Sequence, residues 1–339
     1  MSKRKIKIAQ VGITGHGVTI LNAIKAAPNL DLVSVFDIKS DEVKRVSKEL
    51  GIHPASSFEE LVSVPEVDAV ALVTPNHLHA AQVKQAVKQG KHVFVEKPLA
   101  PTVREAKRMI RDMEEAGLVM MVGHNTRRRL VFRRAKKILD ENRLGTIVAI
   151  EMNVSRPAGL FADLPAWKAD PKITALLPMT QLGIHFIDTV HYLFETRTVR
   201  VGCIAKNIAM KGGAHDATTS ILELESGIPA TLSCYYSTPD VYYIRIYGTD
   251  GILDCQNSSL QLQLLRNGVL QTELEEDFRS EGYASFEEEM REFGSCIADG
   301  VKPETGGEEG LQALAVIEGM VHSLNSNAIV NIDDILKGA

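Results

Sequence analysis

The feature that most constrains this chain is a regular alternation in its first 123 residues. Short apolar runs rich in Val and Ile, without strict polar alternation, are typical of strands buried on both faces of a sheet. Five such runs occur: KIAQVGI, DLVSVFD, VDAVALV, HVFVE and VMMVG. Helical patterns lie between them at residues 41–50, 79–89 and 103–116. This alternation predicts a parallel, doubly wound sheet.

The pattern changes after Gly123. A basic helix precedes the run TIVAIEMNVSR, and MTQLGIHFIDTVHYLF has the spacing of a further helix. Five alternating runs, RVGCIAKNIAM, TTSILELES, PATLSCYYS, YYIRIYG and LQLQLLR, come before two late helices at residues 286–298 and 308–324. Consecutive alternating strands predict a mostly antiparallel sheet with helices on one face. We therefore predict an α/β protein of two domains, residues 1–123 and 124–339.

Composition and charge narrow the functional classes. The chain is 45% hydrophobic and 24% charged, as in ordinary globular proteins, and its net charge of −5 argues against general nucleic-acid binding. No run approaches the roughly 20 apolar residues of a membrane helix, and no signal-peptide pattern follows the basic N-terminus. The four cysteines are scattered without metal spacing, which indicates a reducing compartment. We expect a cytoplasmic protein that binds neither nucleic acid, membrane nor metal.

One stretch, RRRLVFRRAKK at residues 127–137, is locally basic. Val131, Ala135 and Ile138 fall at helical spacing, so the arginines occupy the other faces of a helix. A solvated basic face is the first interpretation, and a site for a phosphorylated ligand is the second.

A glycine-rich turn, VGITGHGVTI, follows the first predicted strand and opens a helix, the context of a dinucleotide-binding turn. We predict that Gly15, His16 and Gly17 supply the tight turn and offer backbone N–H groups to a pyrophosphate, with the His16 backbone more important than its ring. The third glycine of the fingerprint is expected at position 20, where the chain has Ile20. A helix-capping turn explains these glycines nearly as well.

Asp37 ends the second predicted strand, 20 residues after Gly17. A carboxylate there accepts hydrogen bonds from ribose hydroxyls and repels a 2′-phosphate, which favours NAD over NADP, although Lys39 nearby argues the other way. Helix N-capping is the alternative role for Asp37, but Ser40 or Asp41 fills it more naturally. Together these residues predict an NAD site, with further cofactor contacts at Val18, Thr19 and Ile38.

The stretch VTPNHLHAAQVKQAVKQGKHVFVEKPLA identifies a resemblance. It contains Thr74, Pro75 and Asn76 directly after the strand predicted from VDAVALV, and His79 three residues after Asn76. Glu96, Lys97 and Pro98 stand at the end of the strand predicted from HVFVE. Together with VGHN, the Trp167 region, QLGIHFID and GGEEGLQALAVIEGM, it resembles the glucose–fructose oxidoreductase, inositol dehydrogenase and rhizopine-catabolism (Gfo/Idh/MocA) family along nearly the whole chain. The resemblance implies an N-terminal Rossmann domain and a C-terminal α+β domain with a large open sheet. It also implies a nicotinamide held where the two domains meet.

The resemblance implies that Lys97 stands beside the nicotinamide and the reacting carbon, after a cis Lys97–Pro98 bond. Moving a hydride from a carbinol carbon to NAD requires that the hydroxyl lose its proton and that negative charge on oxygen be stabilised. Lys97 is suited to the second task. Without the flanking motif, a surface lysine at a strand end is the simpler interpretation.

His185 is the expected proton acceptor, because an imidazole titrates near neutrality. Gln181 and His185 are four residues apart and so share a helix face. The family motif here reads Asp-x-Gly-x-His, so Gln181 replaces an aspartate. Glutamine holds a hydroxyl but cannot accept a proton. Either His185 and Lys97 suffice, or the chemistry is altered, or catalysis is lost; we favour the first.

The remaining candidates complete two sets. We predict substrate contacts at Gln181, Asn125, Trp167 and Arg127. We predict cofactor contacts at Thr74, Pro75, Asn76, His79, Glu96, Lys97 and Asn125, with Asn125 near the nicotinamide ribose or the substrate.

The predicted function is an NAD-dependent dehydrogenase acting on a CH–OH group of a sugar, polyol or sugar derivative. A redox-assisted hydrolase or lyase with tightly bound NAD and a non-catalytic NAD-binding regulator are the alternatives. An open sheet covered on one face leaves an apolar face for a partner, so we expect a homodimer or homotetramer.

Overall fold

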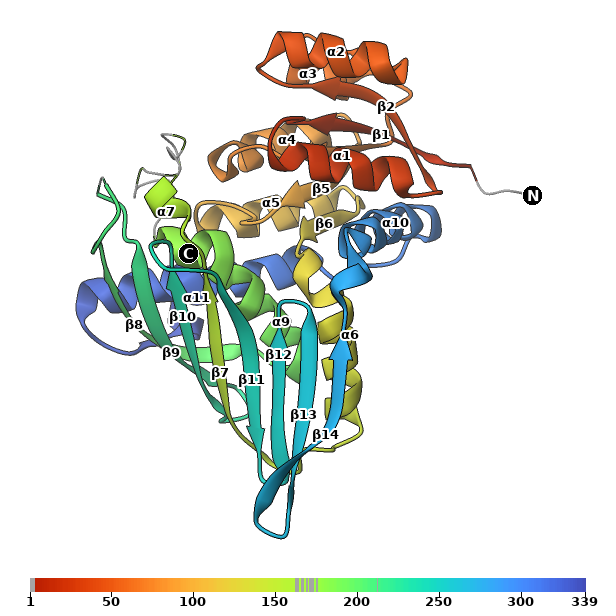
Figure 1. Ribbon diagram of the computed structural model, residues 1–339. Coiled ribbons are helices and arrows are strands. Elements are labelled where there is room, and N and C mark those ends of the chain that lie inside the picture. Colours follow the sequence, from red (N-terminus) through yellow and green to blue (C-terminus); the bar gives the residue numbers. More distant parts are fainter. Residues whose placement is uncertain are drawn as a thin grey trace. The chain divides into compact units, whose positions relative to one another are not determined.

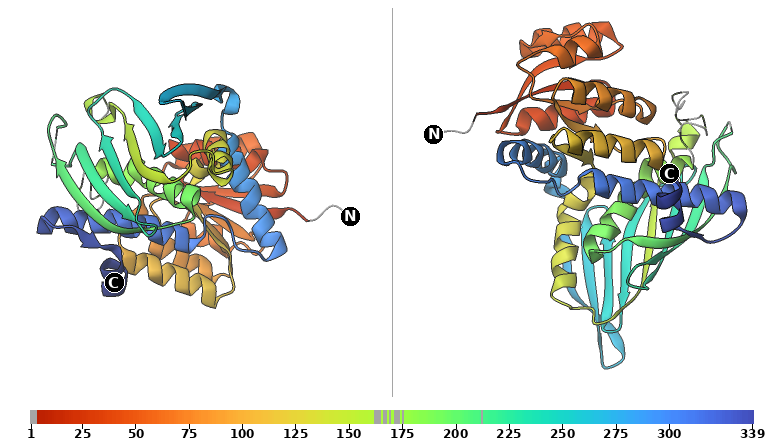
Figure 2. Two further views of the ribbon diagram at one scale, coloured as in Figure 1. Left: turned by 90° about the horizontal axis from the view of Figure 1, so that it is seen from below. Right: turned by 180° about the vertical axis from the view of Figure 1, so that it is seen from behind.

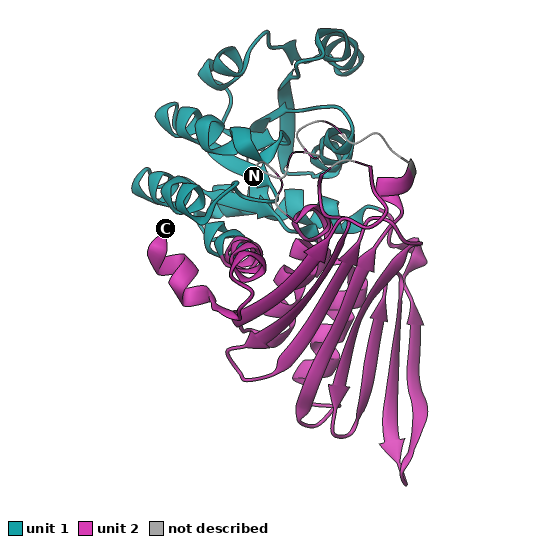
Figure 3. Cartoon of the chain, turned by 90° about the vertical axis from the view of Figure 1, so that its left-hand side faces the viewer, with its two compact units in different colours: residues 1–125, 283–311 teal, residues 126–282, 312–339 magenta. Residues whose placement is uncertain are grey.

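The computed structural model describes residues 4–161, 165, 168, 170, 174, 176–211 and 213–339. The chain forms two compact units (Figure 3), residues 1–125 with 283–311 and residues 126–282 with 312–339. The expected boundary after Gly123 assigned every later residue to the second domain. In the structure, residues 283–311 return to the first unit instead. None of the described helices is long and apolar enough to cross a membrane.

The first unit is built on a six-stranded parallel sheet in the order β3-β2-β1-β4-β5-β6. All five predicted strands form, and the two-residue β3, which ends in a proline, was missed. The strands are β1 Ile6–Val11, β2 Leu30–Phe36, β3 His53–Pro54, β4 Ala69–Leu72, β5 His92–Glu96 and β6 Met120–Gly123. This order is that of the Rossmann fold, which confirms the predicted doubly wound sheet.

Helices connect these strands, and one further helix of this unit comes from much later in the sequence. They are α1 His16–Ala26, α2 Ser40–Leu50, α3 Phe58–Ser63, α4 His79–Lys88, α5 Val103–Glu115 and α10 Ala284–Asp299. Helix α10 lies beside α1 (Figure 1). Its Phe293 is fully buried and meets Phe94 of β5 edge-on, with ring centroids 6.1 Å apart. This apolar contact accounts for the return of residues 283–311 to the first unit.

The second unit is built on a nine-stranded sheet in the order β14-β13-β12-β11-β7-β10-β9-β8-β15. Its strands are β7 Ile147–Ser155, β8 Thr198–Lys206, β9 Ala217–Leu224, β10 Pro229–Tyr235, β11 Val241–Gly248, β12 Gly251–Gln256, β13 Ser259–Arg266, β14 Val269–Asp277 and β15 Val330–Asn331. Among the described strands, β7 and β10 pair parallel and the other neighbours pair antiparallel. The predicted, mostly antiparallel open sheet is confirmed.

Helices cover one face of this sheet. They include α6 Leu130–Asp140 and α9 Ile184–Phe194, which lie in front of it in the right-hand view of Figure 2. Phe186 of α9 meets Phe132 of α6 and Tyr242 of β11 edge-on, at centroid distances of 6.3 and 4.8 Å. The other α-helices among the described residues of this unit are α7 Ala158–Phe161, α12 Ile332–Gly338 and α11 Gly307–Ser326, whose residues from Gln312 onward belong to it.

A buried carboxylate fixes the connection between β8 and β9. Asp216 is 1% exposed, and its side chain accepts the backbone N–H groups of Ile208, Ala209 and Met210 at 2.7–2.8 Å and the Ser237 hydroxyl at 2.7 Å. Burial raises the pKa of Asp216, but these hydrogen bonds outweigh it and the pKa lies below its usual value. Asp216 therefore stabilises the folded connection as a charged group.

We expect Asp216→Asn to lower the free energy of unfolding by about 1–3 kcal/mol near pH 7, because an amide cannot accept all these bonds. The folded-state pKa is depressed, so the wild-type contribution is present above the unfolded pKa of about 3.9 and is lost as the pH falls below it. Urea unfolding near pH 7 and near pH 3 should show the difference between the two proteins shrinking in acid. Asp41→Asn, at a side chain that is 98% exposed, is the control. A difference that stays constant with pH would contradict this role.

Candidate active site

The turn after β1 depends on two glycines that approach neighbouring backbone. Gly12 has φ +82°, and a Cβ there would lie 2.1 Å from the carbonyl oxygen of Val73. A Cβ on Gly17 would lie 2.2 Å from the carbonyl oxygen of Gly12. Only glycine fits such positions. Ile20, which stands where the fingerprint would have its third glycine, is fully buried in the core.

Sequence reasoning missed Gly12 as part of the fingerprint, although its place directly after the first strand was a signal. It also missed Gln10 of β1, which is fully buried. The Gln10 amide donates to the carbonyl oxygens of Gly12 at 2.8 Å and Gly17 at 2.7 Å, so it holds both ends of the turn.

Gly15 lies on the open side of the turn. It has φ +57°, and a Cβ there would meet no atom within 4 Å. It is the N-cap of α1, which has no side-chain cap and no acidic residue in its first turn. The partial positive charge of a helix N-terminus attracts phosphate groups, so the turn fits the pyrophosphate of a dinucleotide. Val18 and Thr19 continue this first helical turn, and Val18 is 47% exposed.

Asp37 follows β2 and joins two turns. Its carboxylate accepts the Ile13 N–H at 2.9 Å, from the glycine turn, and the Lys39 N–H at 3.0 Å, from the turn before α2. Lys39 is the N-cap of α2, so Asp37 is not the capping residue. Asp37 also accepts the Thr14 hydroxyl at 3.4 Å, and because a carboxylate accepts about four hydrogen bonds, capacity is left for a ribose hydroxyl. Ile38 beside it is 92% exposed, an apolar surface suited to an adenine ring.

His79 fixes two further loops from inside. It is fully buried; its Nε2 lies 2.9 Å from the carbonyl oxygen of Thr74, and its Nδ1 lies 3.2 and 3.1 Å from those of Pro98 and Leu99. The ring therefore supports both motifs that carry the resemblance. Its burial means that it can affect a cofactor only through these loops.

Two of the other predicted residues after β4 lie closer to the surface, and the third is buried. Pro75 and Thr74 are partly exposed, and the Thr74 hydroxyl donates to Gln82 at 2.6 Å. Asn76 is 4% exposed and begins a short 3-10 turn.

Glu96 and Lys97 occupy the end of β5. The Lys97–Pro98 peptide is cis, as the resemblance implied. Glu96 is 6% exposed; its carboxylate lies 2.9 Å from Nε2 of His16 and accepts the Lys97 N–H at 3.2 Å. Burial raises the pKa of Glu96, but the charge and hydrogen bond of His16 and the charge of Lys97 lower it below its usual value. The Lys97 side chain is partly exposed.

Asn125 follows β6. It is 8% exposed, and its amide donates to the Ser285 hydroxyl at 3.1 Å, at the start of α10. The predicted cofactor residues thus come after β1, β2, β4, β5 and β6. Because these strands are parallel, their carboxyl ends share one edge of the sheet, where ligands of doubly wound folds bind.

The second unit carries Gln181 and His185, both partly exposed. A single regular helix was expected, but Gln181 lies in a π-helical turn, Met179–Gly183, that leads into α9. A Cβ on Gly183 would lie 2.6 Å from the sulfur of Met179 and 3.0 Å from that of Cys234, so this turn packs tightly against β10. Single π turns occur often at functional sites.

Arg127 has a buried ion pair instead of an open pocket position. It is 5% exposed, and its guanidinium holds Asp188 of α9 at 2.6 and 2.9 Å, with the Tyr192 ring 5.4 Å away. The geometry therefore favours a structural role. Trp167, the other predicted pocket residue, lies outside the described residues.

The first interpretation of the basic stretch at residues 127–137, a solvated face, holds only in part, and the second, a site for a phosphorylated ligand, stays a prediction. Its cations contact carboxylates and aromatic rings of neighbouring elements. Arg133 lies over Tyr192 at 5.1 Å, Arg134 pairs with Glu276 at 2.9 Å, and Lys136 pairs with Asp140 and with Glu195, the latter at 2.9 Å. These cations therefore have partners within their own unit, and Tyr192, Glu195 and Glu276 lie too far along the chain for local periodicity to predict the contacts.

Family models match both parts of the chain. Residues 6–124 match the oxidoreductase family with an NAD-binding Rossmann fold, and residues 132–254 match the GFO/IDH/MocA C-terminal domain. The chain belongs to the Gfo/Idh/MocA oxidoreductase family. The nicotinamide-dinucleotide-binding Rossmann domain predicted from the sequence is thereby confirmed.

Similar proteins include enzymes of carbohydrate chemistry. The 1,5-anhydro-D-fructose reductase of Ensifer adhaerens is 28% identical, covering 87% of this chain and 89% of its own. The scyllo-inositol 2-dehydrogenase (NAD⁺) of Bacillus subtilis strain 168 is 26% identical, covering 83% of each chain. A solved structure from Desulfitobacterium hafniense DCB-2, provisionally named an NADPH-dependent oxidoreductase, has a TM-score of 0.92 at 26% identity, covering 99% of this chain and 100% of its own.

Proposed function

We propose that this oxidoreductase uses NAD to transfer a hydride between the nicotinamide and a carbinol or carbonyl carbon of a sugar, polyol or sugar derivative. The observation that carries the proposal is Lys97, partly exposed in a turn that Glu96 and His79 contact at the carboxyl edge of the sheet. The substrate class is supported by the names of the relatives.

The residues of the first unit fit the parts of a dinucleotide. The Gly15 turn and the start of α1 would hold the pyrophosphate, Asp37 the adenosine ribose, and Ile38 the adenine. When bound, the nicotinamide supplies the hydride acceptor or donor.

The chain's own groups would handle the oxygen and the proton. The Lys97 ammonium would donate a hydrogen bond to the substrate oxygen and stabilise its negative charge. His185 would accept the hydroxyl proton, which passes to solvent when the imidazolium is neutralised. Gln181 would hold a neighbouring hydroxyl, since its amide both donates and accepts.

Asp37 supports a preference for NAD over NADP, because a buried carboxylate repels a 2′-phosphate. We expect wild type to bind NADH at least about tenfold more tightly than NADPH, and Asp37→Ser to remove that preference. The variant should also bind both nucleotides more weakly, because the Ile13 and Lys39 N–H groups lose the carboxylate that accepts their hydrogen bonds. Fluorescence titration measures both affinities, with the exposed Asp41→Ser as the control. Equal wild-type affinities would contradict the assignment.

Lys97 is the residue on which turnover should depend. Once a panel of polyols and aldoses has identified a substrate, we expect Lys97→Ala to lower kcat by roughly two to four powers of ten. NADH affinity should change little, since the turn at Gly15 and the contacts of Asp37 are unaltered. Lys88→Ala, at an exposed lysine of α4, is the matched control. Near-normal turnover in Lys97→Ala would show that the lysine is structural.

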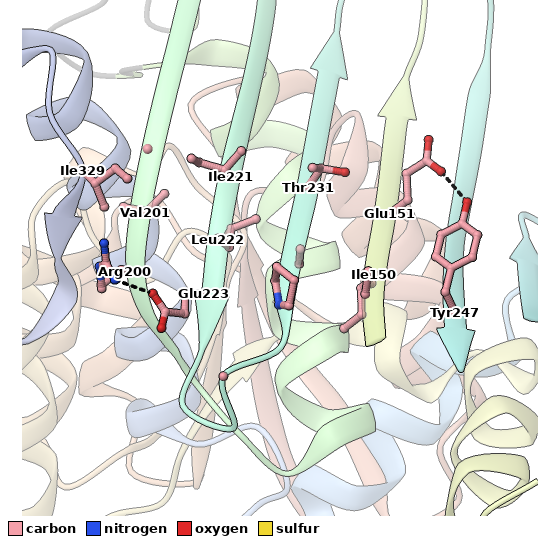
Figure 4. A pocket seen from close by; sticks show the side chains of 15 residues that line it. Ile150, Glu151, Arg200, Val201, Ile221, Leu222, Glu223, Thr231, Tyr247 and Ile329 are labelled. Atoms are coloured by element: carbon pink, nitrogen blue, oxygen red, sulfur yellow. Dashed lines mark hydrogen bonds and ion pairs between the residues drawn. The ribbon is translucent and has the colours of Figure 1, made fainter. Parts of the chain in front are cut away.

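We also infer a homo-oligomer, formed through the face of the nine-stranded sheet that α6 and α9 leave uncovered. This face carries a hollow of about 560 Å³ (Figure 4). The expected apolar face is mixed: Ile221 and Ile329 are each 52% exposed, while Arg200 pairs with Glu223 at 2.8 Å and Glu151 accepts the Tyr247 hydroxyl at 2.8 Å. Tyrosine and arginine are enriched at protein interfaces, and burial of the two exposed isoleucines would add apolar contact.

We expect Ile221→Glu to dissociate the assembly, because it places a charge in the lining of this hollow. Light scattering at micromolar concentration should show a dimer or tetramer for wild type and a smaller species for the variant. Val269→Glu, at a valine that is 61% exposed on β14, should leave the mass unchanged. A monomeric wild type would overturn the inference.

A further inference from the structure

His16 stands at a junction within the first unit. It is the first residue of α1, next to Gly15 in the glycine turn, yet its Nε2 lies 2.9 Å from Oε1 of Glu96, the last residue of β5. On another side, its ring meets Phe286 of α10 edge-on at a centroid distance of 5.7 Å. The ring therefore has two contacts of its own, whereas the sequence indicated more importance for the His16 backbone than for its ring.

The structure leaves space for the Glu96 carboxylate beside this ring. Gly123 of β6 pairs with Glu96 across the sheet, and a Cβ at Gly123 would lie 3.0 Å from Oε1 of Glu96. Glycine thus makes room for a group that is costly to remove from water without a partner. The second oxygen, Oε2, accepts the Lys97 N–H at 3.2 Å. Glu96 therefore connects His16 on one side with the backbone of Lys97 on the other.

We propose that His16 is a positioning residue, which couples the glycine turn to the Lys97 turn through Glu96. The inference rests on the proposed function, in which the first turn holds the pyrophosphate and the second carries the lysine. Cofactor binding that orders the glycine turn would then also fix the turn that carries Lys97. Loss of the contact between His16 and Glu96 should therefore both weaken cofactor binding and displace the Lys97 side chain.

A double-mutant cycle with His16→Leu and Glu96→Gln tests the coupling. We expect His16→Leu to weaken NADH binding about tenfold or more in fluorescence titration without substrate, and to lower kcat with little change in KM. In the Glu96→Gln background, His16→Leu should lower NADH affinity and kcat much less, because the contact between residues 16 and 96 is already altered. His16→Gln, whose amide can still donate, should restore most of both quantities.

His53→Leu is the matched control. His53 of β3 lies 2.9 Å from Glu60, and its side chain is 50% exposed, close to the 47% of the His16 side chain. The Glu60 side chain is 39% exposed, whereas the Glu96 side chain is only 8% exposed. This substitution should leave NADH binding and kcat unchanged, since an exposed pair contributes little.

Additive effects of the two substitutions, or an unchanged NADH affinity in His16→Leu, would overturn the coupling. Should Glu96→Gln fail to fold, the comparison of His16→Leu with His16→Gln decides, and equal affinities and kcat values would overturn it. A wild type that binds neither NADH nor NADPH would instead overturn the proposed function. The two failures are therefore distinguishable.

Discussion

The parallel pairing of β1 with β2 on one side and β4 on the other is the constraint from which the candidate cofactor site follows. It brings the carboxyl ends of the strands to one edge, and it requires close backbone packing at the turn after β1. Gly12 meets that requirement against Val73, and Gly17 meets it against Gly12. With this turn fixed by Gln10, the start of α1 lies where a dinucleotide phosphate can be held.

Buried polar side chains connect the loops at that edge of the sheet. Asp37 joins the glycine turn to the turn before α2, His79 joins the Thr74 loop to the Pro98 loop, and Glu96 joins His16 to Lys97. Each group has partners for its buried atoms in two different loops. Such contacts limit independent movement of the loops, which suits a site where a lysine must meet one oxygen with little freedom.

Much of this was predictable from the sequence, since the five buried strands and the second sheet follow from apolar periodicity. The candidate residues came from local motifs, TPN with His79 and EKP. The contacts between residues distant in sequence were not predictable. Nothing in the periodicity of α10 shows that Phe293 packs against Phe94 in the first unit. The same applies to Arg127, whose partner Asp188 lies 61 residues away. The π turn at Gln181 depends on tight packing of Gly183 against Cys234, which no local pattern records.

The central claim is hydride transfer to or from the nicotinamide, and isotope transfer tests it most directly. Wild-type protein is incubated with NAD and a panel of polyols and sugars deuterated at their carbinol carbons, and the nicotinamide released is analysed by mass spectrometry. The proposed function predicts deuterium on the reduced nicotinamide, in amounts equal to the oxidised product. Product formed without label on the released nicotinamide would contradict net oxidation and indicate a redox-neutral hydrolase or lyase.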